Sequence, residues 1–493
     1  MSSSRFGPLV RSFPFRIFLI ALCLRLIPVL FTRSLGIGLD DMFQYDMLAR
    51  SLAGGNGFRW YARADLTLLE PYVDFDLSDP AYDPVRGVAT SFRAPLYPAF
   101  LALIYSLFGA GEARFFAARF AQALLGASLA PLAYWIALRF LPAAFLKEEA
   151  ETKAARLAAW MVAAYPILLL YPIGLVTENL FLPFVLLAFL FLLRARERPA
   201  AARWLLSGAG LGLAALTRSV ILPFAALAVL WAWFALRQKR GAALMALALA
   251  LTVAPWVVRN SLLHQKLSGI ESSMGYNLYL GYHPDGDGSF FFGPSLDLLP
   301  ILDDAARDRI GTQKALGFIQ ERPDRILPLA LNRLGFFFGL ETRAFTYFYS
   351  NDVFGYVPPP FLLLIFLLLT LPFIVVSVSA ACGSVLLRWN PPAVLLLLLF
   401  VSYVTPHVFI LSEDRFHLAL VPFMAISAAW FWTTGCAGLA ARWRASRASK
   451  MIALLAAAAV CLLLFNWGLE LWRDTDTLAQ LFGPHGNQSY FSY

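Results

Sequence analysis

Long apolar runs recur along the whole of this 493-residue chain. A helix needs about 17–25 apolar residues to cross the hydrocarbon core of a bilayer, and several of the runs reach that length. Only 14% of the residues are charged, where a soluble domain carries about a quarter. The sequence therefore predicts an all-α polytopic membrane protein, with most of its length in membrane-spanning helices.

Basic residues in the short connections predict the orientation of these helices. Three arginines, Arg5, Arg11 and Arg16, precede the first run, which places the N-terminus in the cytoplasm under the positive-inside rule. The other basic connections, assigned to the same side, are 139–156, 194–203, 237–240, the turn at Arg388 and 442–450. The net charge of +9 thus fits cytoplasmic loops and anionic lipids, and nucleic acid is not an expected partner.

This orientation predicts about 11 spans. They are 15–33, 114–138, 157–172, 178–193, 204–217, 219–236, 241–258, 360–381, 391–411, 416–434 and 451–469. A further apolar run, 94–110, contains Pro95 and Pro98 and would break the parity, so we expect it to lie at the outer interface or to dip in and return. Residues 204–217 and 219–236 are each short, and one broken helix is the alternative.

The same layout organises the chain into a transmembrane module, 1–469, and an outer C-terminal tail, 470–493. Two outer loops carry interfacial helices, a first loop at 34–113 and a large loop at 259–358. The first run ends in Phe31-Thr32-Arg33 without a small-x-small cleavage site, so we expect it to remain as an anchor. The four cysteines lack CxxC spacing and the five histidines lack metal-ligand spacing, so neither a metal site nor a cofactor is predicted.

Charged residues gather at the predicted outer face. A polar group near lipid is energetically costly, so its presence there indicates a specific role. They are Asp40, Asp41, Arg93, Glu178, Arg218, Arg259 and Arg415. The planar fork of arginine forms paired, charge-assisted bonds with a phosphate, and a neighbouring carboxylate could act as general base on an acceptor hydroxyl. The pattern thus predicts a site for a phosphorylated substrate.

These residues also have structural interpretations, although Arg218 is harder to explain in this way because it interrupts an otherwise apolar run. Asp40 and Asp41 could cap a helix that begins near Met42, and Glu178 could be an acid favoured by the dipole at a helix start. The arginines at positions 93, 259 and 415 could be interfacial residues that extend toward water. Arg25, in the middle of the first span, should face protein or water, and its role is left open between structure and function.

Several short motifs resemble those of membrane glycosyltransferases of the GT-C superfold, in the protein O-mannosyltransferase-like and aminoarabinose (lipid A) transferase-like families. The segment from Asp41 through Tyr45 to Ala49 resembles their Asp-x-x-x-Tyr-x-x-x-Ala motif in the first outer loop. The other matching segments follow in order: 54–58, Arg93-Ala-Pro-Leu-Tyr97-Pro98, Thr177-Glu178, Leu216-Thr-Arg218, Pro255 to Asn260, Gly275 to Gly281, and Arg415-Phe416. Together they cover about 380 residues.

The resemblance implies a sugar donor on a polyprenyl phosphate and an acceptor that is a lipid, a glycan or a protein. It implies that Asp41, with Glu178 as the second acid, is catalytic. It implies that substrate is bound by Asp40, Tyr45, Arg93, Tyr97, Arg218, Arg259, Tyr276, Asn277 and Arg415. In many relatives a glutamate follows the first acid, whereas Met42 follows it here, which argues against a metal at Asp41.

The expected function is therefore transfer of a sugar from a polyprenyl-phosphate carrier at the outer, periplasmic face of a bacterial inner membrane, by direct attack with inversion. The alternative is a transporter or flippase for a lipid-linked or anionic solute, which should show related halves and polar residues at mid-bilayer. The two halves of this sequence do not match. A structural scaffold for the cell envelope is a third interpretation, and it predicts no cluster of arginines and carboxylates.

Overall fold

The computed structural model describes residues 12–77, 82–140, 148–350, 352 and 355–489. Within these ranges, eight helical units are long and apolar enough to span a membrane. They are α2 (Phe13–Phe31), α6 (Arg114–Ala127) continued by α7 (Leu129–Phe140), α10 (Glu178–Glu197), α13 (Lys239–His264), α19 (Pro359–Leu386), α20 (Pro391–Phe409), α21 (Val421–Ala445) and α22 (Arg447–Arg473). The predicted class, an all-α polytopic membrane protein, is confirmed.

A ninth candidate span is bent by 54°. It consists of α8 (Glu148–Ala164), α9 (Pro166–Leu170) and the 3-10 turn η1 (Tyr171–Ile173). Because Pro166 has no N–H, the carbonyl of Val162 loses its helical partner. The guanidinium of Arg25 donates to that carbonyl at 3.3 Å and to the carbonyl of Ala163 at 3.2 Å. Arg25 is fully buried, so its role in the structure is to satisfy the break in a neighbouring span.

Two shorter helices account for the remaining predicted spans. They are α11 (Ala201–Thr217) and α12 (Leu222–Phe234), joined through Arg218 and the turn η2 (Ser219–Ile221). Gly208 lies against Met245 and Gly212 lies against Thr252, so α11 and α13 run parallel. The chain in α12 must therefore return in the opposite direction, which argues for two helices and against one broken helix.

These two helices leave the number of complete crossings a prediction. With 17 and 13 residues, α11 and α12 are about 26 and 20 Å long, against a hydrocarbon core of about 30 Å. The run 94–110 forms α5 (Leu96–Phe108), whose 13 residues extend over about 20 Å and pack against α3 and α6. A helix of that length does not cross a bilayer by itself, in keeping with the predicted interfacial position.

The two loops predicted to lie outside the membrane fold into short elements. The first loop contains α3 (Asp41–Ala53), the antiparallel strands β1 (Arg59–Trp60) and β2 (Val88–Ala89), α4 (Arg63–Leu69) and α5. The large loop contains α14 (Met274–Tyr282), α15 (Phe292–Ser295), α16 (Asp304–Glu321), η3 (Pro323–Arg325), α17 (Ile326–Phe337) and α18 (Thr342–Ser350). The turn η4 (Asp414–Ala419) precedes α21, and α23 (Thr475–Leu481) and η5 (Gly486–Gln488) follow α22.

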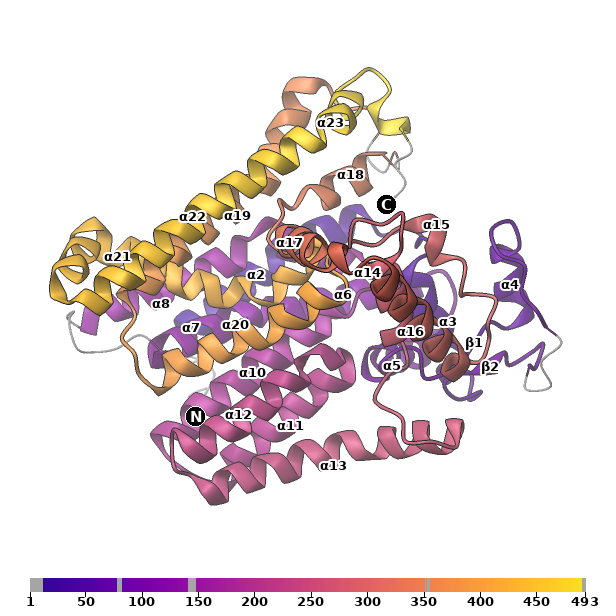
Figure 1. The fold of residues 1–493 in the computed structure, drawn as a ribbon, viewed down its shortest axis with the longest axis horizontal. Helices are drawn as coiled ribbons and strands as arrows, with labels where there is room; N and C mark the ends of the chain where they lie inside the picture. The colour runs from indigo at the N-terminus through magenta and orange to yellow at the C-terminus, as the bar shows by residue number, and fades with distance from the viewer. Residues whose placement is uncertain (1–11, 78–81, 141–147, 351, 353–354, 490–493) are drawn as a thin grey trace, which may run out of the picture.

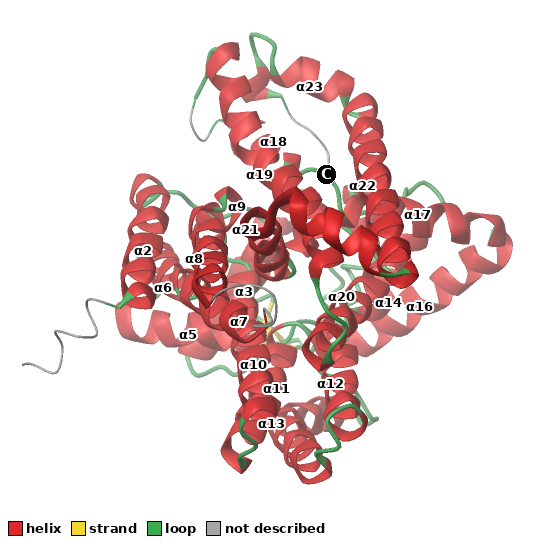
Figure 2. Ribbon diagram, turned by 90° about the vertical axis from the view of Figure 1, so that its left-hand side faces the viewer, coloured by secondary structure: helices red, strands yellow, loops and turns green. Residues whose placement is uncertain are grey.

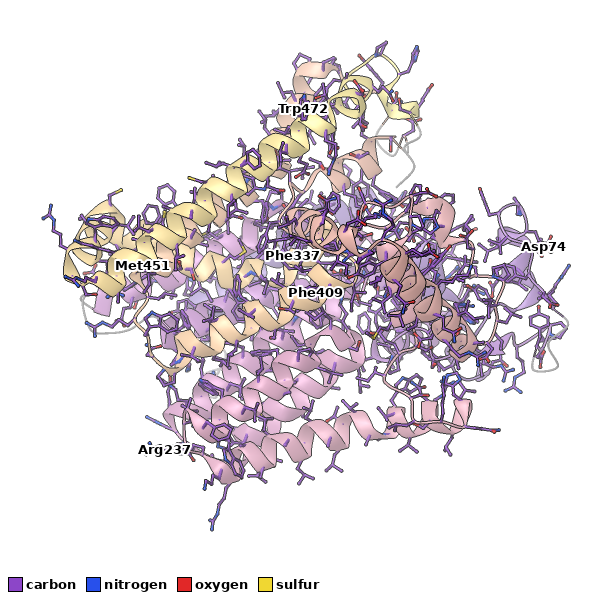
Figure 3. All side chains as sticks on the ribbon, in the orientation of Figure 1. Asp74, Arg237, Phe337, Phe409, Met451 and Trp472 are labelled. Carbon is purple, nitrogen blue, oxygen red and sulfur yellow. The ribbon has the colours of Figure 1, made fainter. Side chains whose placement is uncertain are left out.

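Elements of both outer loops lie together at one end of the molecule. Figure 1 shows α3, α4, α14, α16 and the two strands on the right, while α8 and the junction of α21 with α22 lie on the left. In Figure 3, Arg237 and Met451, which lie beside two of the basic connections, are on the left, and Asp74 of the first loop is on the far right. These two basic connections and Asp74 of the first loop therefore lie on opposite sides of the molecule.

The hydrophobic core lies among the spans α7, α8, α10, α19, α20 and α21. Figure 2 shows α18, α19, α22 and α23 at the top of the molecule, α10–α13 at the bottom, and α2, α6 and α8 on one side. Helices from distant parts of the sequence thus surround the segments that carry the charged residues.

Candidate functional site

The first acidic pair divides into one residue that caps a helix and one carboxylate that binds arginines. The Oδ1 atom of Asp40 accepts the backbone N–H of Met42 at 2.8 Å, so Asp40 is the N-cap of α3. Asp41, the first residue of the helix, turns its side chain to arginines instead. The capping interpretation therefore applies to Asp40 alone.

Two arginines from distant segments bind opposite oxygens of Asp41. Arg93 donates from Nη2 to Oδ1, and Nη2 of Arg415 lies 3.2 Å from Oδ2. The side chain of Asp41 keeps 30% of its surface exposed. Burial by itself would raise the pKa of the Asp41 carboxyl, but the charges of Arg93 and Arg415 outweigh it and hold that pKa well below its usual range.

Arg415 also contacts a second, buried carboxylate. Its Nε atom lies 2.6 Å from Oε2 of Glu413, a buried carboxylate whose other oxygen lies 2.8 Å from Nη1 of Arg343. Glu413 and Arg343 are not among the predicted site residues. Glu413 stands two residues before the motif Arg415-Phe416, whereas Arg343, at the start of α18, lies outside every motif.

A second ion pair lies beside this one. Arg218, at the junction of α11 and η2, donates from Nη1 to Oε1 of Glu178, the first residue of α10. Its guanidinium lies over the ring of Phe416 at 5.1 Å, and the guanidinium of Arg415 lies 5.6 Å from the same ring. Phe416 therefore joins the Arg218–Glu178 pair to the group around Asp41, which brings Arg93, Arg415 and Arg218 into one region.

Arg259 is used elsewhere. It donates to the backbone carbonyls of Thr90 at 2.5 Å and Phe58 at 3.3 Å, and it lies over the ring of Trp256 at 4.8 Å. These contacts fasten the strands of the first loop to the end of α13. The structure thus brings three of the four predicted arginines together and gives the fourth a structural position.

The predicted tyrosines Tyr45 and Tyr97 lie beside the charged region at different depths. Tyr45 contacts Tyr97 edge to face at 5.0 Å, and the guanidinium of Arg93 lies 5.3 Å from the Tyr45 ring. Burial raises the pKa of Tyr45 to about 12, so its hydroxyl stays protonated as a neutral donor. Tyr97 is fully buried and donates to Oε1 of Gln122 at 2.5 Å, which makes it a support for Tyr45.

The two predicted residues of α14 lie on the side of the large loop. Tyr276 contacts Phe92 edge to face at 5.5 Å and donates its hydroxyl to the carbonyl of Ser295 at 3.0 Å. Asn277 is half-buried, and its backbone N–H donates to the carbonyl of Ser273 at 3.0 Å. Tyr276 thus touches the residue next to Arg93, whereas Asn277 has no described contact with the charged group.

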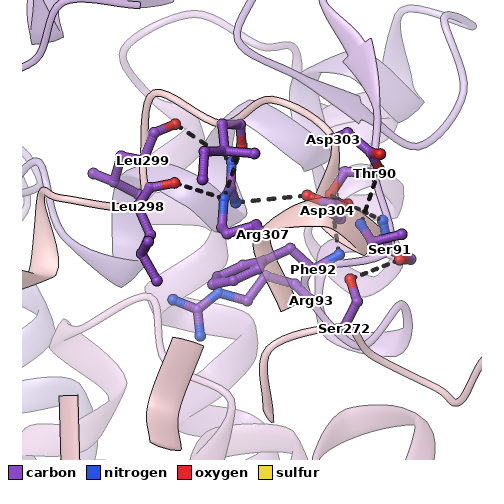
Figure 4. Close-up of polar contacts among 12 residues, drawn as sticks. Thr90, Ser91, Phe92, Arg93, Ser272, Leu298, Leu299, Asp303, Asp304 and Arg307 are labelled. Atoms are coloured by element: carbon purple, nitrogen blue, oxygen red, sulfur yellow. Dashed lines mark hydrogen bonds and ion pairs between the residues drawn. The ribbon is translucent and has the colours of Figure 1, made fainter. Parts of the chain in front are cut away.

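A buried network of the large loop fixes the segment that carries Arg93 (Figure 4). Oδ2 of Asp304, at the start of α16, accepts the hydroxyl of Thr90 and the backbone N–H of Ser91, each at 2.6 Å. Arg307, fully buried, lies 3.5 Å from the other oxygen of Asp304 and donates to the carbonyl of Ile301. The two outer loops are therefore joined directly beneath Arg93, a contact between positions more than 200 residues apart that no local pattern predicts.

Within the described ranges, no group of three or more His, Cys, Asp or Glu side chains has an arrangement that could hold a metal ion. The charged region itself offers one partly exposed carboxylate among arginines and a neutral phenol. Such a region can bind an anion and accept a proton.

Comparison with known proteins supports the resemblance drawn from the motifs. A sequence profile of the family described as dolichyl-phosphate-mannose-protein mannosyltransferase matches residues 92–258, a stretch that includes Arg93, Glu178 and Arg218. Over these residues the match agrees with the resemblance to protein O-mannosyltransferase-like enzymes. A comparison with curated proteins found no match.

Three solved structures are similar in outline. The oligosaccharyltransferase of Archaeoglobus fulgidus in complex with Zn and sulfate is 17% identical, with 98% of this chain and 59% of that chain covered and a TM-score of 0.47. AglB from the same organism, with an inhibitory peptide and a dolichol-phosphate, is 14% identical, with 99% and 61% covered and a TM-score of 0.47. ArnT from Cupriavidus metallidurans, bound to undecaprenyl phosphate, is 14% identical, with 89% and 80% covered and a TM-score of 0.39. This chain spans about three fifths of the length of the archaeal enzymes.

Proposed function

We propose that this protein is a glycosyltransferase that moves a sugar from a polyprenyl-phosphate carrier to an acceptor hydroxyl at the outer, periplasmic face of a bacterial inner membrane. The observation that carries the proposal is the position of Asp41, whose carboxylate lies between Arg93 and Arg415. An acid and two guanidinium groups are the parts that transfer from a phosphate leaving group needs. The family match at residues 92–258 supports the same chemistry, because its description names a lipid phosphate that carries a sugar.

The arginines are the proposed phosphate site. Each guanidinium now contacts a carboxylate, Arg93 and Arg415 at Asp41 and Arg218 at Glu178. A phosphate of the carrier would compete with Asp41 for the N–H groups of Arg93 and Arg415, since both anions accept the same forked donors. Donor binding would therefore release Asp41 from its two ion pairs and raise the low pKa of its carboxyl toward the ordinary value, which makes it a better base.

The reaction then follows with a balanced set of bonds. The carboxylate of Asp41 takes the proton of the acceptor hydroxyl, and the acceptor oxygen forms a bond to the anomeric carbon of the sugar. The bond from that carbon to the phosphate oxygen breaks, and the electron pair leaves with the lipid phosphate, which Arg93, Arg415 and Arg218 stabilise. A single displacement inverts the anomeric centre and needs no covalent intermediate with the protein.

Asp41 is the preferred base over Glu178. The side chain of Glu178 is only 6% exposed and is paired with Arg218, whereas Asp41 keeps 30% exposed at the start of α3. Thr177 also donates its hydroxyl to Glu178 at 3.2 Å. We assign Glu178 the role of holding Arg218 toward the carrier phosphate, with Asp41 as the group that meets the acceptor.

The proposed topology assigns the site to the outer face. It keeps residues 1–469 as the transmembrane module, 34–113 and 259–358 as outer loops, and 470–493 as an outer tail. The arginine–carboxylate group draws on both loops and on η4. The helix α3, which begins at Asp41, lies on the right in Figure 1, whereas Arg237 and Met451 lie on the left in Figure 3. The acceptor is a lipid, a glycan or a protein.

The test is direct transfer by the purified full chain in lipid nanodiscs. Polyprenyl-phosphate-linked sugars of several kinds are offered with lipid, glycan and peptide acceptors, and the release of sugar-free polyprenyl phosphate is measured. The proposal expects release that depends on an acceptor and is lost with Asp41→Asn. Movement of the intact sugar-lipid between leaflets, without cleavage, would instead identify a flippase.

A further inference from the structure

The segment that carries Arg415 is tied to the large outer loop by a second buried contact, four residues from the first. One cross-link is the Arg343–Glu413 ion pair described above. The other joins His417 of η4 to Glu341, which lies between α17 and α18, with 3.0 Å between Nε2 and Oε1. Arg415 lies between these two cross-links in sequence, so the direction of its side chain depends on both.

The Glu341–His417 contact is shielded on every side. His417 is fully buried and its ring stacks on Phe373 of α19, with 4.0 Å between centroids. The hydroxyl of Tyr165, at the junction of α8 and α9, donates to the same Oε1 atom of Glu341 at 2.7 Å. The pair therefore lies between α19 on one side and the junction of α8 with α9 on the other.

Hydrogen-bond geometry determines how many protons the pair holds. Nδ1 of His417 lies 2.8 Å from the carbonyl oxygen of Phe337, which can only accept, so Nδ1 carries a hydrogen. Nε2 then faces Oε1 of Glu341, and a hydrogen bond between them needs one more proton, on the imidazole or on the carboxyl. Either arrangement leaves the pair neutral. Without that proton, a lone pair would face a carboxylate inside the protein.

The surrounding groups agree with a retained proton. Burial raises the pKa of the Glu341 carboxyl, although the bond from His417 opposes the shift. Asp414 on η4 acts in the same direction as burial, and the second oxygen of Glu341 is buried without a described partner, which costs less for a neutral carboxyl. Two other charged groups lie near the pair. Arg343 follows Glu341 by two residues, and Glu470 of α22 accepts the backbone N–H of Leu340 at its Oε2 atom.

We propose that Glu341 and His417 are a positioning pair that aims Arg415 at the carrier phosphate and that works only while the pair keeps its shared proton. The proposal rests on the function proposed above. Neither residue contacts the reacting atoms, and both act through η4. Figure 3 labels Phe337, whose carbonyl orients the imidazole, near the middle of the view.

The experiment measures binding of sugar-free undecaprenyl phosphate to the full chain in nanodiscs, at a series of pH values. Glu341→Ala removes the cross-link, and we expect binding weaker by about ten-fold or more, the usual loss for a hydrogen bond to a charged group. Glu341→Gln keeps the cross-link, because an amide N–H at the position of Oε1 donates to a neutral His417, although the bond that Tyr165 donates to that same atom is lost, as it is in Tyr165→Phe. It should therefore bind as tightly as the unmodified protein.

The pH series separates positioning from packing. The unmodified protein should lose affinity at high pH, where the pair releases its shared proton. Glu341→Gln has no such proton, so its affinity should show only the titration of the phosphate, which is common to both proteins. Tyr165→Phe, which removes a bond to Glu341 but leaves the pair, serves as the matched control and should keep the pH profile of the unmodified protein.

The possible results separate a failure of the positioning proposal from a failure of the proposed function. Equal affinity of Glu341→Ala and the unmodified protein, or identical pH profiles for the unmodified protein and Glu341→Gln, would overturn the positioning proposal while leaving the proposed function intact. No binding of undecaprenyl phosphate to the unmodified protein would remove the proposed function and this inference with it. If Glu341→Ala does not fold, the comparison of the two pH profiles decides by itself.

Discussion

Arg415 and Asp41 are 374 residues apart in the sequence, yet Nη2 of the arginine lies 3.2 Å from Oδ2 of the carboxylate. Arg93 binds the opposite oxygen, so one carboxylate is shared by two guanidinium groups. A phosphate presents the same forked acceptor to arginine, and in this arrangement Asp41 occupies the position that the carrier phosphate would take. The base and the leaving group of the proposed reaction therefore compete for the same donors.

This competition predicts opposite effects on turnover and on binding for Asp41→Asn. An amide cannot accept the acceptor's proton, so sugar transfer should fall by about 10²–10⁴-fold, the usual contribution of a general base. Binding of undecaprenyl phosphate should be retained or tightened, because the neutral side chain no longer competes for Arg93 and Arg415. Asp40→Asn is the control, since asparagine also caps helices well and activity should persist. Loss of phosphate binding in Asp41→Asn would contradict this account.

Removing the charge of Arg93 should move the acid limb of the activity profile to higher pH. The lowered pKa of Asp41 keeps its carboxylate ionised in the folded protein. The ion pairs therefore stabilise the protein fully at a pH above the pKa that Asp41 has in the unfolded chain, and this stabilisation is lost as the pH falls through the lower pKa of the folded state. Arg93→Gln removes one of the two positive charges that counteract the effect of burial on Asp41, so the pKa of Asp41 rises. The carboxylate of the variant then binds a proton at a pH where the carboxylate of the unmodified protein is still ionised. The rate of transfer at decreasing pH measures the shift.

The control for that profile is Arg86→Gln, which changes an exposed arginine in the same outer loop. It should leave the acid limb unchanged. If both variants shift alike, the effect belongs to the overall charge of the loop and the assignment of the acid limb to Asp41 is incorrect.

The residues that sequence patterns could identify are those that interrupt apolar runs. Asp41, Arg93, Arg218 and Arg415 each stand out because a charge at the lipid boundary is costly, and each falls within a short motif. Glu413 gives no such separate signal, because a buried carboxylate beside an arginine in a turn resembles a solvated charge run until the fold shows what covers it.

Arg259 shows a contact that the sequence patterns did not predict. Its place at a helix end and within a motif suggested a phosphate ligand, but its donors go to the carbonyls of Thr90 and Phe58. Which way a long side chain turns depends on contacts between distant segments, and a single sequence does not report them. The helices themselves were predictable because apolar length is a local property, apart from α11 and α12, whose lengths fall below that of an ordinary span.

The orientation of the first spans can be tested with single cysteines at Glu112 and Glu149, both exposed, in a background whose four native cysteines are replaced by alanine. The unit formed by α6 and α7 lies between them and is long enough to cross the membrane once. A membrane-impermeant maleimide should label position 112 from outside intact cells and position 149 only after permeabilisation. Labelling of both from one side would reverse the assignment of the first outer loop.

Arg25→Lys should destabilise the protein without changing the binding of undecaprenyl phosphate. Lysine keeps the buried charge but cannot reach both the Val162 and Ala163 carbonyls that Arg25 now serves, and a buried acceptor left without a donor costs about 1–3 kcal/mol. Thermal unfolding in detergent measures the loss. Arg16→Lys, an exposed position of the same helix, should unfold at the same temperature as the unmodified protein.

The geometry of the proposed phosphate site is tested by exchanging arginine for lysine at positions 415 and 259. Arg415→Lys keeps the positive charge but loses the fork that reaches Glu413 and Asp41 together, so affinity for undecaprenyl phosphate should fall by about 10–100-fold, equivalent to about 1.5–3 kcal/mol. Arg259→Lys is the matched control, because its donors go to backbone carbonyls outside the charged group and affinity should stay unchanged. Isothermal titration in nanodiscs gives both values at one pH and one salt concentration. An unchanged affinity in both variants would show that only long-range charge attracts the carrier, and the shared site of Arg93, Arg218 and Arg415 would then have no role in recognising its phosphate.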